Sequence, residues 1–155
     1  MSNTSFTNVY PEGVFTDGVI SVVEQALKDI GDIVIRVNQD NVSYIMGSID
    51  STKLYLIDGD IDFTGVSIEV PSTGLFISGH NLDLSIMRCA DANYTMFTGA
   101  TAGNVFLKDL SIDVSGAGSQ VYNLTAATGF EAHEAVRVNW NNCTSLGTLT
   151  GYRQG

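Results

Sequence analysis

Residues 54–63 have the sequence LYLIDGDIDF, in which apolar side chains fall at offsets 0, 2, 7 and 9 from Leu54. Two runs of period two separated by about four residues are typical of two short strands joined by a turn. The same spacing recurs in residues 75–84, 105–114 and 136–145. It predicts these inward positions: Leu54, Leu56, Ile61 and Phe63; Leu75, Ile77, Leu82 and Leu84; Val105, Leu107, Ile112 and Val114; Val136, Val138, Cys143 and Ser145.

The four blocks begin at residues 54, 75, 105 and 136, so successive blocks lie 21, 30 and 31 residues apart. Repeats of this length are typical of folds that stack one supersecondary unit on the next. A third segment with apolar residues follows each of the first three blocks, at 67–70, 95–98 and 121–125. We therefore expect an all-β fold, a right-handed, single-stranded parallel β-helix with three strands per turn.

The spacing also has a weaker match near the start of the chain. Ile35, Val37, Val42 and Tyr44 fit it, which predicts a strand at 33–37, a turn at 38–41 and a second strand at 42–46. Before this segment, residues 17–30 carry an apolar stripe at helical spacing, and Gly31 can end a helix. We expect an N-terminal segment 1–32 whose amphipathic helix caps a β-helix over residues 33–155.

The other end of the predicted β-helix has no comparable cap. The segment 151–155 has the pattern of another turn beginning. Exposed strand edges template aggregation unless they are covered. We therefore expect either that the natural chain continues or that another chain covers this end.

Composition excludes several classes of partner. A chain of 155 residues with 44% hydrophobic content can bury one core, and 7 basic against 17 acidic residues give a formal charge of −10. Such a charge disfavours binding to nucleic acid. No apolar run reaches the roughly 18 residues that span a bilayer, and the first residues lack the pattern of a signal peptide. We expect no membrane insertion, and Cys89 and Cys143 fit buried thiols better than a disulfide or metal site.

Several segments resemble one known class of protein. After the predicted helix, residues 44–53 (YIMGSIDSTK), 54–62 (LYLIDGDID) and 74–79 (GLFISG) resemble the first turns of bacteriophage tail-spike and tail-fibre proteins of the pectin-lyase-like β-helix class. Residues 142–155 (NCTSLGTLTGYRQG) are similar to an interior turn of the same proteins. The resemblance implies a homotrimeric rod in the virion, in contact with other tail proteins, whose longer relatives bind or degrade host-surface glycans.

Two groups of carboxylates are candidate sites. Asp58, Asp60 and Asp62 are spaced like ligands of a calcium loop, but Phe63 stands where such a loop needs glycine, so we favour no metal site here and expect no cofactor. Stacking would also bring Asp62, Asp83 and Asp113 into one column. That column could bind a cation, form an acid pair for glycoside hydrolysis, meet basic residues of a neighbouring chain, or simply be a solvated face.

The long segments 85–103 and 115–135 carry candidate binding residues, namely Arg88, Tyr94, Tyr122 and Phe130. Aromatic residues on loops of a rigid scaffold bind sugars or proteins. They equally serve to bury one face of a solenoid in a trimer, and we favour this second interpretation.

The sequence therefore predicts a structural virion component, the β-helical part of a phage tail spike or fibre that supports attachment to the host surface. The alternative is a pectin-lyase-like polysaccharide-degrading enzyme, a hydrolase or lyase, that uses the Asp62, Asp83 and Asp113 column.

Overall fold

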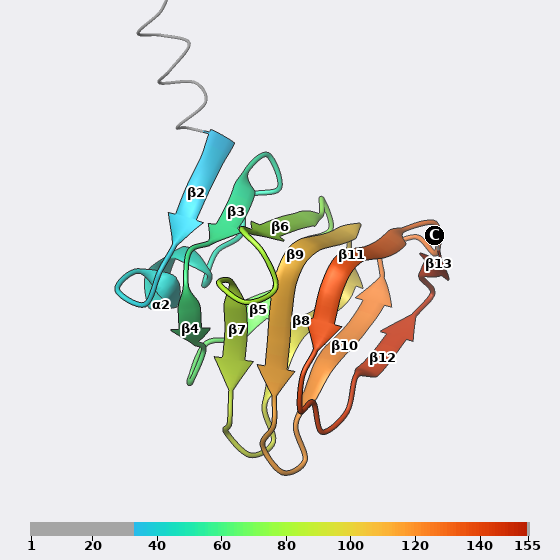
Figure 1. Cartoon of the computed structure of the whole chain (residues 1–155). Helices are drawn as coiled ribbons and strands as arrows, with labels where there is room; N and C mark the ends of the chain where they lie inside the picture. The colour runs from blue at the N-terminus through green and yellow to red at the C-terminus, as the bar shows by residue number, and fades with distance from the viewer. Residues whose placement is uncertain (1–32, 155) are drawn as a thin grey trace, which may run out of the picture. The chain divides into compact units, whose positions relative to one another are not determined.

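The computed structural model of the chain describes residues 33–154, and residues Ile35–Gly155 form one compact unit. This unit is an all-β parallel β-solenoid of about four turns, and the described residues contain one short helix, α2 (Val42–Ile45) (Figure 1). The helix that we expect at 17–30 lies outside the described residues.

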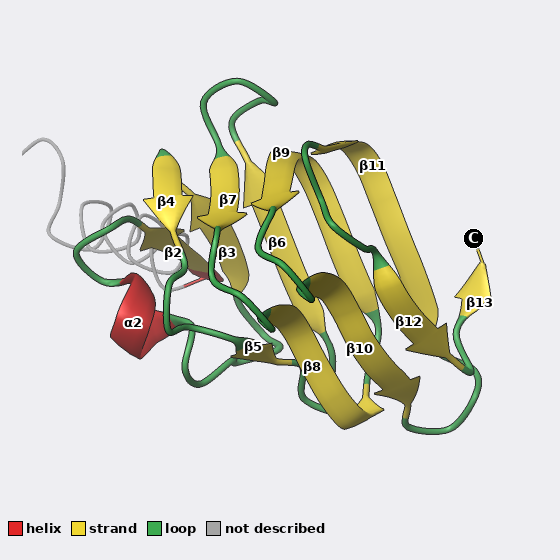
Figure 2. Cartoon of the chain, turned by 90° about the horizontal axis from the view of Figure 1, so that it is seen from below, coloured by secondary structure: helices red, strands yellow, loops and turns green. Residues whose placement is uncertain are grey.

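The strands form two sheets, and every pair with an assigned register is parallel (Figure 2). In the larger sheet the order is β13 (Arg153–Gln154), β11 (Ala132–Trp140), β9 (Val105–Val114), β6 (Leu75–Gly79), β3 (Leu54–Ile57) and β2 (Val34–Val37). The second half of β9 pairs with β7 (Ile86–Cys89), which pairs with β4 (Asp60–Asp62). The smaller sheet has the order β12 (Gly147–Thr150), β10 (Gln120–Ala126), β8 (Thr95–Ala102) and β5 (Ile68–Glu69).

The register confirms that one turn stacks on the next. Tyr55 lies opposite Ile77, Ile77 opposite Leu107 and Leu107 opposite Ala135, so successive turns take 22, 30 and 28 residues. The three predicted segments at 67–70, 95–98 and 121–125 are also confirmed, because they form β5, β8 and β10 of the smaller sheet.

The core lies between the two sheets and contains the side chains that point inward from each turn. The third block is confirmed in full, since Val105, Leu107, Ile112 and Val114 are all buried. Four further predicted positions are buried as well: Ile61, Phe63, Leu75 and Ile77.

In β3 the inward register was wrong by one residue. Tyr55 and Ile57 are buried, whereas Leu54 and Leu56 alternate with them and are only partly buried. All four residues of this strand are apolar, so an alternating pattern cannot distinguish its two faces. The two leucines contribute instead to the outer face of the sheet.

The second block was wrong in its second half. Leu82 and Leu84 are 37% and 60% exposed and lie in a turn that the Asn81 carboxamide organises by accepting the N–H groups of Asp83 and Leu84. In this turn of the solenoid the second strand is β7, which begins only at Ile86 and whose Met87 lies opposite Ile61 and Ile112. An inserted loop therefore displaces the strand toward the C-terminus.

The fourth block departs from the prediction at Val136, which is 45% exposed and lies opposite Lys108. Arg137 has a φ of 51°, so the chain bends between Val136 and Val138 and only Val138 faces inward. Cys143 is partly buried against the core, and Ser145 is exposed.

The second strand predicted at 42–46 is instead the short helix α2. The Asn38 carboxamide accepts the N–H groups of Asp40 and Asn41, while the Asn41 carboxamide accepts the Asn38 N–H and donates to the Arg36 carbonyl. Such local bonds favour a turn over an extended strand. Val42 is buried, but Tyr44 is 72% exposed and does not take the predicted inward position.

Candidate functional site

The column of three carboxylates is not formed, because Asp83 lies in the turn after Asn81. Arg88 occupies the place expected for Asp83, opposite Asp62 on one side and Asp113 on the other. Its guanidinium donates two hydrogen bonds to Asp60, of which the bond from Nε measures 3.1 Å. This bond to Asp60, together with the nearby carboxylates, raises the pKa of Arg88. The outer face of β4, β7 and β9 therefore contains an arginine between its carboxylates, where we expected a column of aspartates alone.

The three carboxylates that are spaced like a calcium loop also have protein partners. Asp58 and Asp60 bind arginine side chains, and Asp62 Oδ1 accepts from the Thr64 N–H (2.9 Å) and hydroxyl (2.7 Å). Over residues 33–154 no group of three or more ligating side chains is placed to hold a metal ion.

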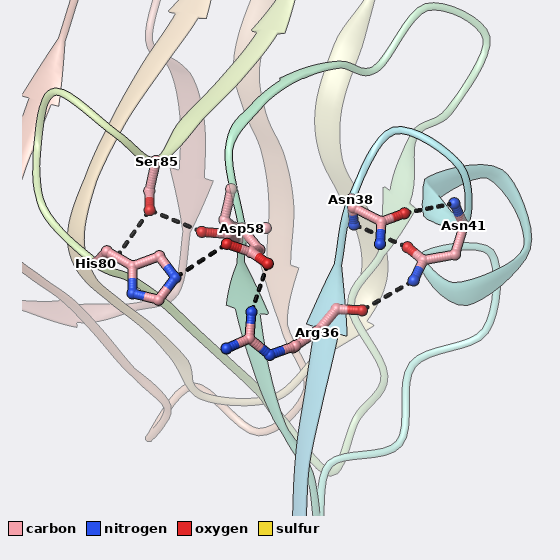
Figure 3. Close-up of polar contacts among 7 residues, drawn as sticks. Arg36, Asn38, Asn41, Asp58, His80 and Ser85 are labelled. Atoms are coloured by element: carbon pink, nitrogen blue, oxygen red, sulfur yellow. Dashed lines mark hydrogen bonds and ion pairs between the residues drawn. The ribbon is translucent and has the colours of Figure 1, made fainter.

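A second polar cluster joins three consecutive turns around Asp58 (Figure 3). Arg36 Nη1 lies 2.5 Å from Asp58 Oδ2, and His80 Nε2 lies 3.1 Å from Asp58 Oδ1. The hydrogen bond with His80, and then the Arg36 charge, hold the pKa of Asp58 below its usual range. Arg36 is on β2, Asp58 follows β3 and His80 follows β6, so the cluster ties these turns together.

Ser85, His80 and Asp58 have the side chains of a serine hydrolase triad but not its geometry. The Ser85 hydroxyl donates to the Ile57 carbonyl at 2.7 Å and accepts the backbone N–H of His80, so it does not contact the imidazole ring. Ser85 is fully buried. A triad needs the imidazole on the serine oxygen and room for a substrate, so this serine is a structural link between turns.

A third ion pair lies where β9 and β11 bend. Arg137 Nε lies 2.5 Å from Asp109 Oδ1, and its Nη2 lies 3.2 Å from Oδ2. Both residues have positive φ, 57° for Asp109 and 51° for Arg137. The hydrogen bond from Arg137 lowers the pKa of Asp109. The pair therefore links two successive turns at the same bend.

Two of the four predicted binding residues are in the core, contrary to the expectation that they are exposed. Tyr94 is 7% exposed and donates its hydroxyl to the Val66 carbonyl at 2.5 Å. Tyr122 is 3% exposed and stacks on Phe97, with 5.4 Å between ring centroids. Burial raises the pKa of both phenols. Tyr94 directly precedes β8 and Tyr122 lies within β10, whereas the sequence analysis had placed both tyrosines on the long segments 85–103 and 115–135.

Tyr122 also anchors the last turn of the described chain. Its hydroxyl lies 2.7 Å from His133 Nε2, and its ring makes T-shaped contacts with the His133 and Trp140 rings at centroid distances of 4.8 and 5.9 Å. Burial lowers the pKa of His133, which favours the neutral imidazole.

Of the other two predicted binding residues, Arg88 is engaged by Asp60, while Phe130 is 69% exposed. The Arg153 guanidinium lies over the Phe130 ring, 4.6 Å from its centroid. The Glu131 carboxylate orders the loop by accepting the N–H groups of Thr128, Gly129 and Phe130, and the bonds from Thr128 above all lower the pKa of Glu131. Phe130 is therefore an accessible aromatic ring on an ordered loop.

The sequence analysis missed an apolar groove on the outer face of β6, β9 and β11. Phe76 lies opposite Phe106, which lies opposite Glu134, and in the next outward row Lys108 lies opposite Val136. These side chains line a groove of about 270 Å³. The signal was present, because Phe76 and Phe106 each follow the first inward residue of their blocks, but only the inward offsets had been considered.

No model of a protein family matches this chain, and no curated protein or solved structure does either. Among residues 33–154, no helix is long and apolar enough to cross a membrane.

Proposed function

We propose that the chain is a structural virion component, the β-helical part of a phage tail spike or tail fibre that supports attachment to the host surface. In this proposal the solenoid is a right-handed β-helix with three strands per turn, three copies associate, and the assembly contacts other tail proteins. The resemblance of residues 44–62, 74–79 and 142–155 to such proteins supports it.

The observation that carries the proposal is the use of charged side chains between turns. The pairs Arg36–Asp58, Asp60–Arg88 and Asp109–Arg137 each join residues one turn apart. Exposed ion pairs add only about 0.2 to 1 kcal/mol each to stability. They do, however, favour one register of one turn on the next, and a fixed register is what a rod needs to hold an attached region at a constant distance and orientation.

The buried serines make the same kind of link. The Ser85 hydroxyl donates to the Ile57 carbonyl, that of Ser111 to Leu82 and that of Ser119 to Asp91, in each case across one turn. Hydrogen bonds to buried hydroxyls stabilise the corners, where strand pairing is interrupted. Inside and outside, therefore, polar groups connect turns to one another.

The alternative, a polysaccharide-degrading enzyme, depended on a specific set of acids. Asp62 and Asp113 are separated by Arg88, and Asp83 is in a loop, so the site named for that activity is not assembled. No other arrangement of the described residues favours the enzyme over the structural role.

The proposal is tested by locating the chain in its natural source. Particles would be purified by density gradient from the source culture, and their peptides measured by quantitative mass spectrometry beside those of the particle-free fraction. We expect peptides from residues 54–137 to follow the particles, with a copy number that is a multiple of three. Peptides confined to the particle-free fraction would refute the virion assignment.

A further inference from the structure

The groove on β6, β9 and β11 exposes apolar side chains on the outside of the solenoid. Phe76 is 42% exposed and Val136 is 45% exposed, and the Phe76 and Phe106 ring centroids are 5.8 Å apart. These side chains stand on adjacent strands whose backbones are hydrogen-bonded in register, so the groove is fixed by the sheet. A fixed apolar surface with polar groups beside it is typical of a site of association.

The charges at the groove are balanced, unlike those of the chain as a whole. Lys108 and Glu134 both line the groove, on neighbouring strands, and both are exposed. Neither belongs to an ion pair within residues 33–154, whereas Arg36, Arg88 and Arg137 are all paired with aspartates there. The groove therefore presents one cation and one anion, neither of which forms a salt bridge among these residues, although the Lys108 charge also acts on the adjacent Asp109.

We infer that this groove is the surface through which copies of the chain associate, with Lys108 of one copy paired with Glu134 of the next and the apolar floor buried between them. The inference rests on the proposed function, which requires three copies, and it names the face that they use. Cyclic association repeats one contact between two different parts of the surface, and a contact that contains both a cation and an anion satisfies this requirement.

The distribution of charge indicates which partner binds in this groove. Copies with a formal charge of −10 repel one another, so they approach most easily where the surface is apolar and locally neutral. An acidic glycan or a nucleic acid would require an excess of cations, but Glu134 offsets Lys108 at this groove. A second copy of this chain brings the matching acid and base together with the matching apolar floor.

The test measures the native mass of the chain by light scattering during gel filtration across a dilution series. The variants are Phe76→Ser, Lys108→Glu, Glu134→Lys and the double exchange Lys108→Glu with Glu134→Lys. The matched control is Leu84→Ser, which changes an exposed leucine that does not line the groove. Circular dichroism monitors folding, and the charge variants keep the inference testable if Phe76→Ser misfolds, because they alter only exposed groups.

We expect the wild type to have three times the mass of the 16.6 kDa chain. Phe76→Ser and each single charge change should raise the concentration needed for association at least tenfold. The double exchange should restore association, because it recreates the pair with opposite polarity, and Leu84→Ser should behave as the wild type does.

The alternative outcomes separate the two proposals. Groove variants that keep the wild-type mass at every dilution would overturn this inference while leaving the trimer of the proposed function intact. A wild type that is monomeric at all concentrations would overturn the trimer and the groove contact together, and the virion assignment would then stand or fall on the particle measurement alone.

Discussion

Arg88 lies among three carboxylates, with Asp60 bound to it and Asp62 and Asp113 on the neighbouring turns. Replacing Arg88 with Gln removes the pair with Asp60 and leaves Asp62 and Asp113, on the two strands that flank β7, without a cation between them. An exposed pair adds about 0.2 to 1 kcal/mol, and the two aspartates that remain two strands apart repel one another most strongly at low salt. We therefore expect Arg88→Gln to lower the free energy of unfolding by about 1 kcal/mol, measured by urea denaturation at low ionic strength.

Salt distinguishes this electrostatic cause from lost packing. The loss of unfolding free energy in Arg88→Gln should shrink in 0.5 M NaCl, because at this salt concentration charges interact only over a Debye length of about 4 Å. Arg36→Gln is the matched control, because it also removes an exposed arginine–aspartate pair, while Asp58 retains its contact with His80. If both variants lost the same unfolding free energy at every salt concentration, Arg88 would not be needed to offset the charges of Asp60, Asp62 and Asp113.

Gly79 is packed so closely that a single added carbon has no space. An ideal Cβ at this position would lie 2.3 Å from the Asp109 carbonyl oxygen and 2.5 Å from Ser85 Cβ. The first of these atoms is backbone of the next turn, which cannot move without disturbing the bend at Asp109. We expect Gly79→Ala to destabilise the chain by about 1 to 3 kcal/mol, the usual cost of overpacking, as measured by thermal or urea unfolding.

Gly47→Ala is the control for this prediction. Its ideal Cβ would meet nothing closer than 3.4 Å, and its φ is not in the left-handed region. Its stability should stay within about 0.5 kcal/mol of the wild type, as for most surface changes. If Gly79→Ala were equally harmless, the close stacking of this corner on the next turn would be contradicted.

At the scale of the element, the registers show what the sequence could and could not specify. Block 105–114 was predicted in full because Val105 and Leu107 alternate with Phe106 and Lys108, and the bend at Asp109 falls inside the predicted turn. The bend at Arg137 instead falls between Val136 and Val138, where the spacing assumed regular alternation. Asn and Asp adopt positive φ more readily than other non-glycine residues, as at Asp109, but an arginine gives no such signal, so the slip at Arg137 could not be anticipated.

The candidate sites depended on these same registers. The carboxylate column required Leu82 and Leu84 to be a strand, and once the loop at 80–85 is inserted, Arg88 takes the place of Asp83. Asn81 is a turn former and could have indicated the loop. The buried state of Tyr94 and Tyr122 was missed for a different reason, because both were assigned to the long segments 85–103 and 115–135, although the apolar segments 95–98 and 121–125 within them predicted strands.

The last turn has a pH dependence that follows from His133. Burial holds the pKa of His133 below its usual value, which is about 6.5 in the unfolded chain. The unfolded state therefore binds a proton first as the pH falls. The stability that His133 contributes is fully present above about pH 6.5 and decreases as the pH falls from that value through the lower pKa of the folded state.

We expect His133→Gln to remove this contribution while a polar side chain can still reach the Tyr122 hydroxyl. The measurement is the difference in melting temperature between pH 7.5 and pH 5.5, which should be smaller in the variant than in the wild type. An unchanged difference in His133→Gln would show that this imidazole is not what makes the turn sensitive to acid.

At the scale of the molecule, stability should vary along the solenoid, because each turn contacts mainly its neighbours. β9 is paired on both sides, with β6 and β7 on one side and β11 on the other, and most of its residues are buried. In β12 all four residues are exposed, and it pairs with β10 alone. Opening β12 disrupts one interface between turns, whereas opening β9 disrupts two.

Hydrogen exchange measured by mass spectrometry checks this gradient in the 155-residue chain. We expect amide protection to be highest in β9 and β8 and lower in β12 and β13, since regions with fewer neighbours open at lower free energy. Gly79→Ala should then reduce protection in β6 and β9 more than in β12, because β12 can already open without them. Equal exchange rates in all strands would instead show that the turns open only together, as one cooperative unit, and that the contacts between turns are strong enough to suppress partial unfolding.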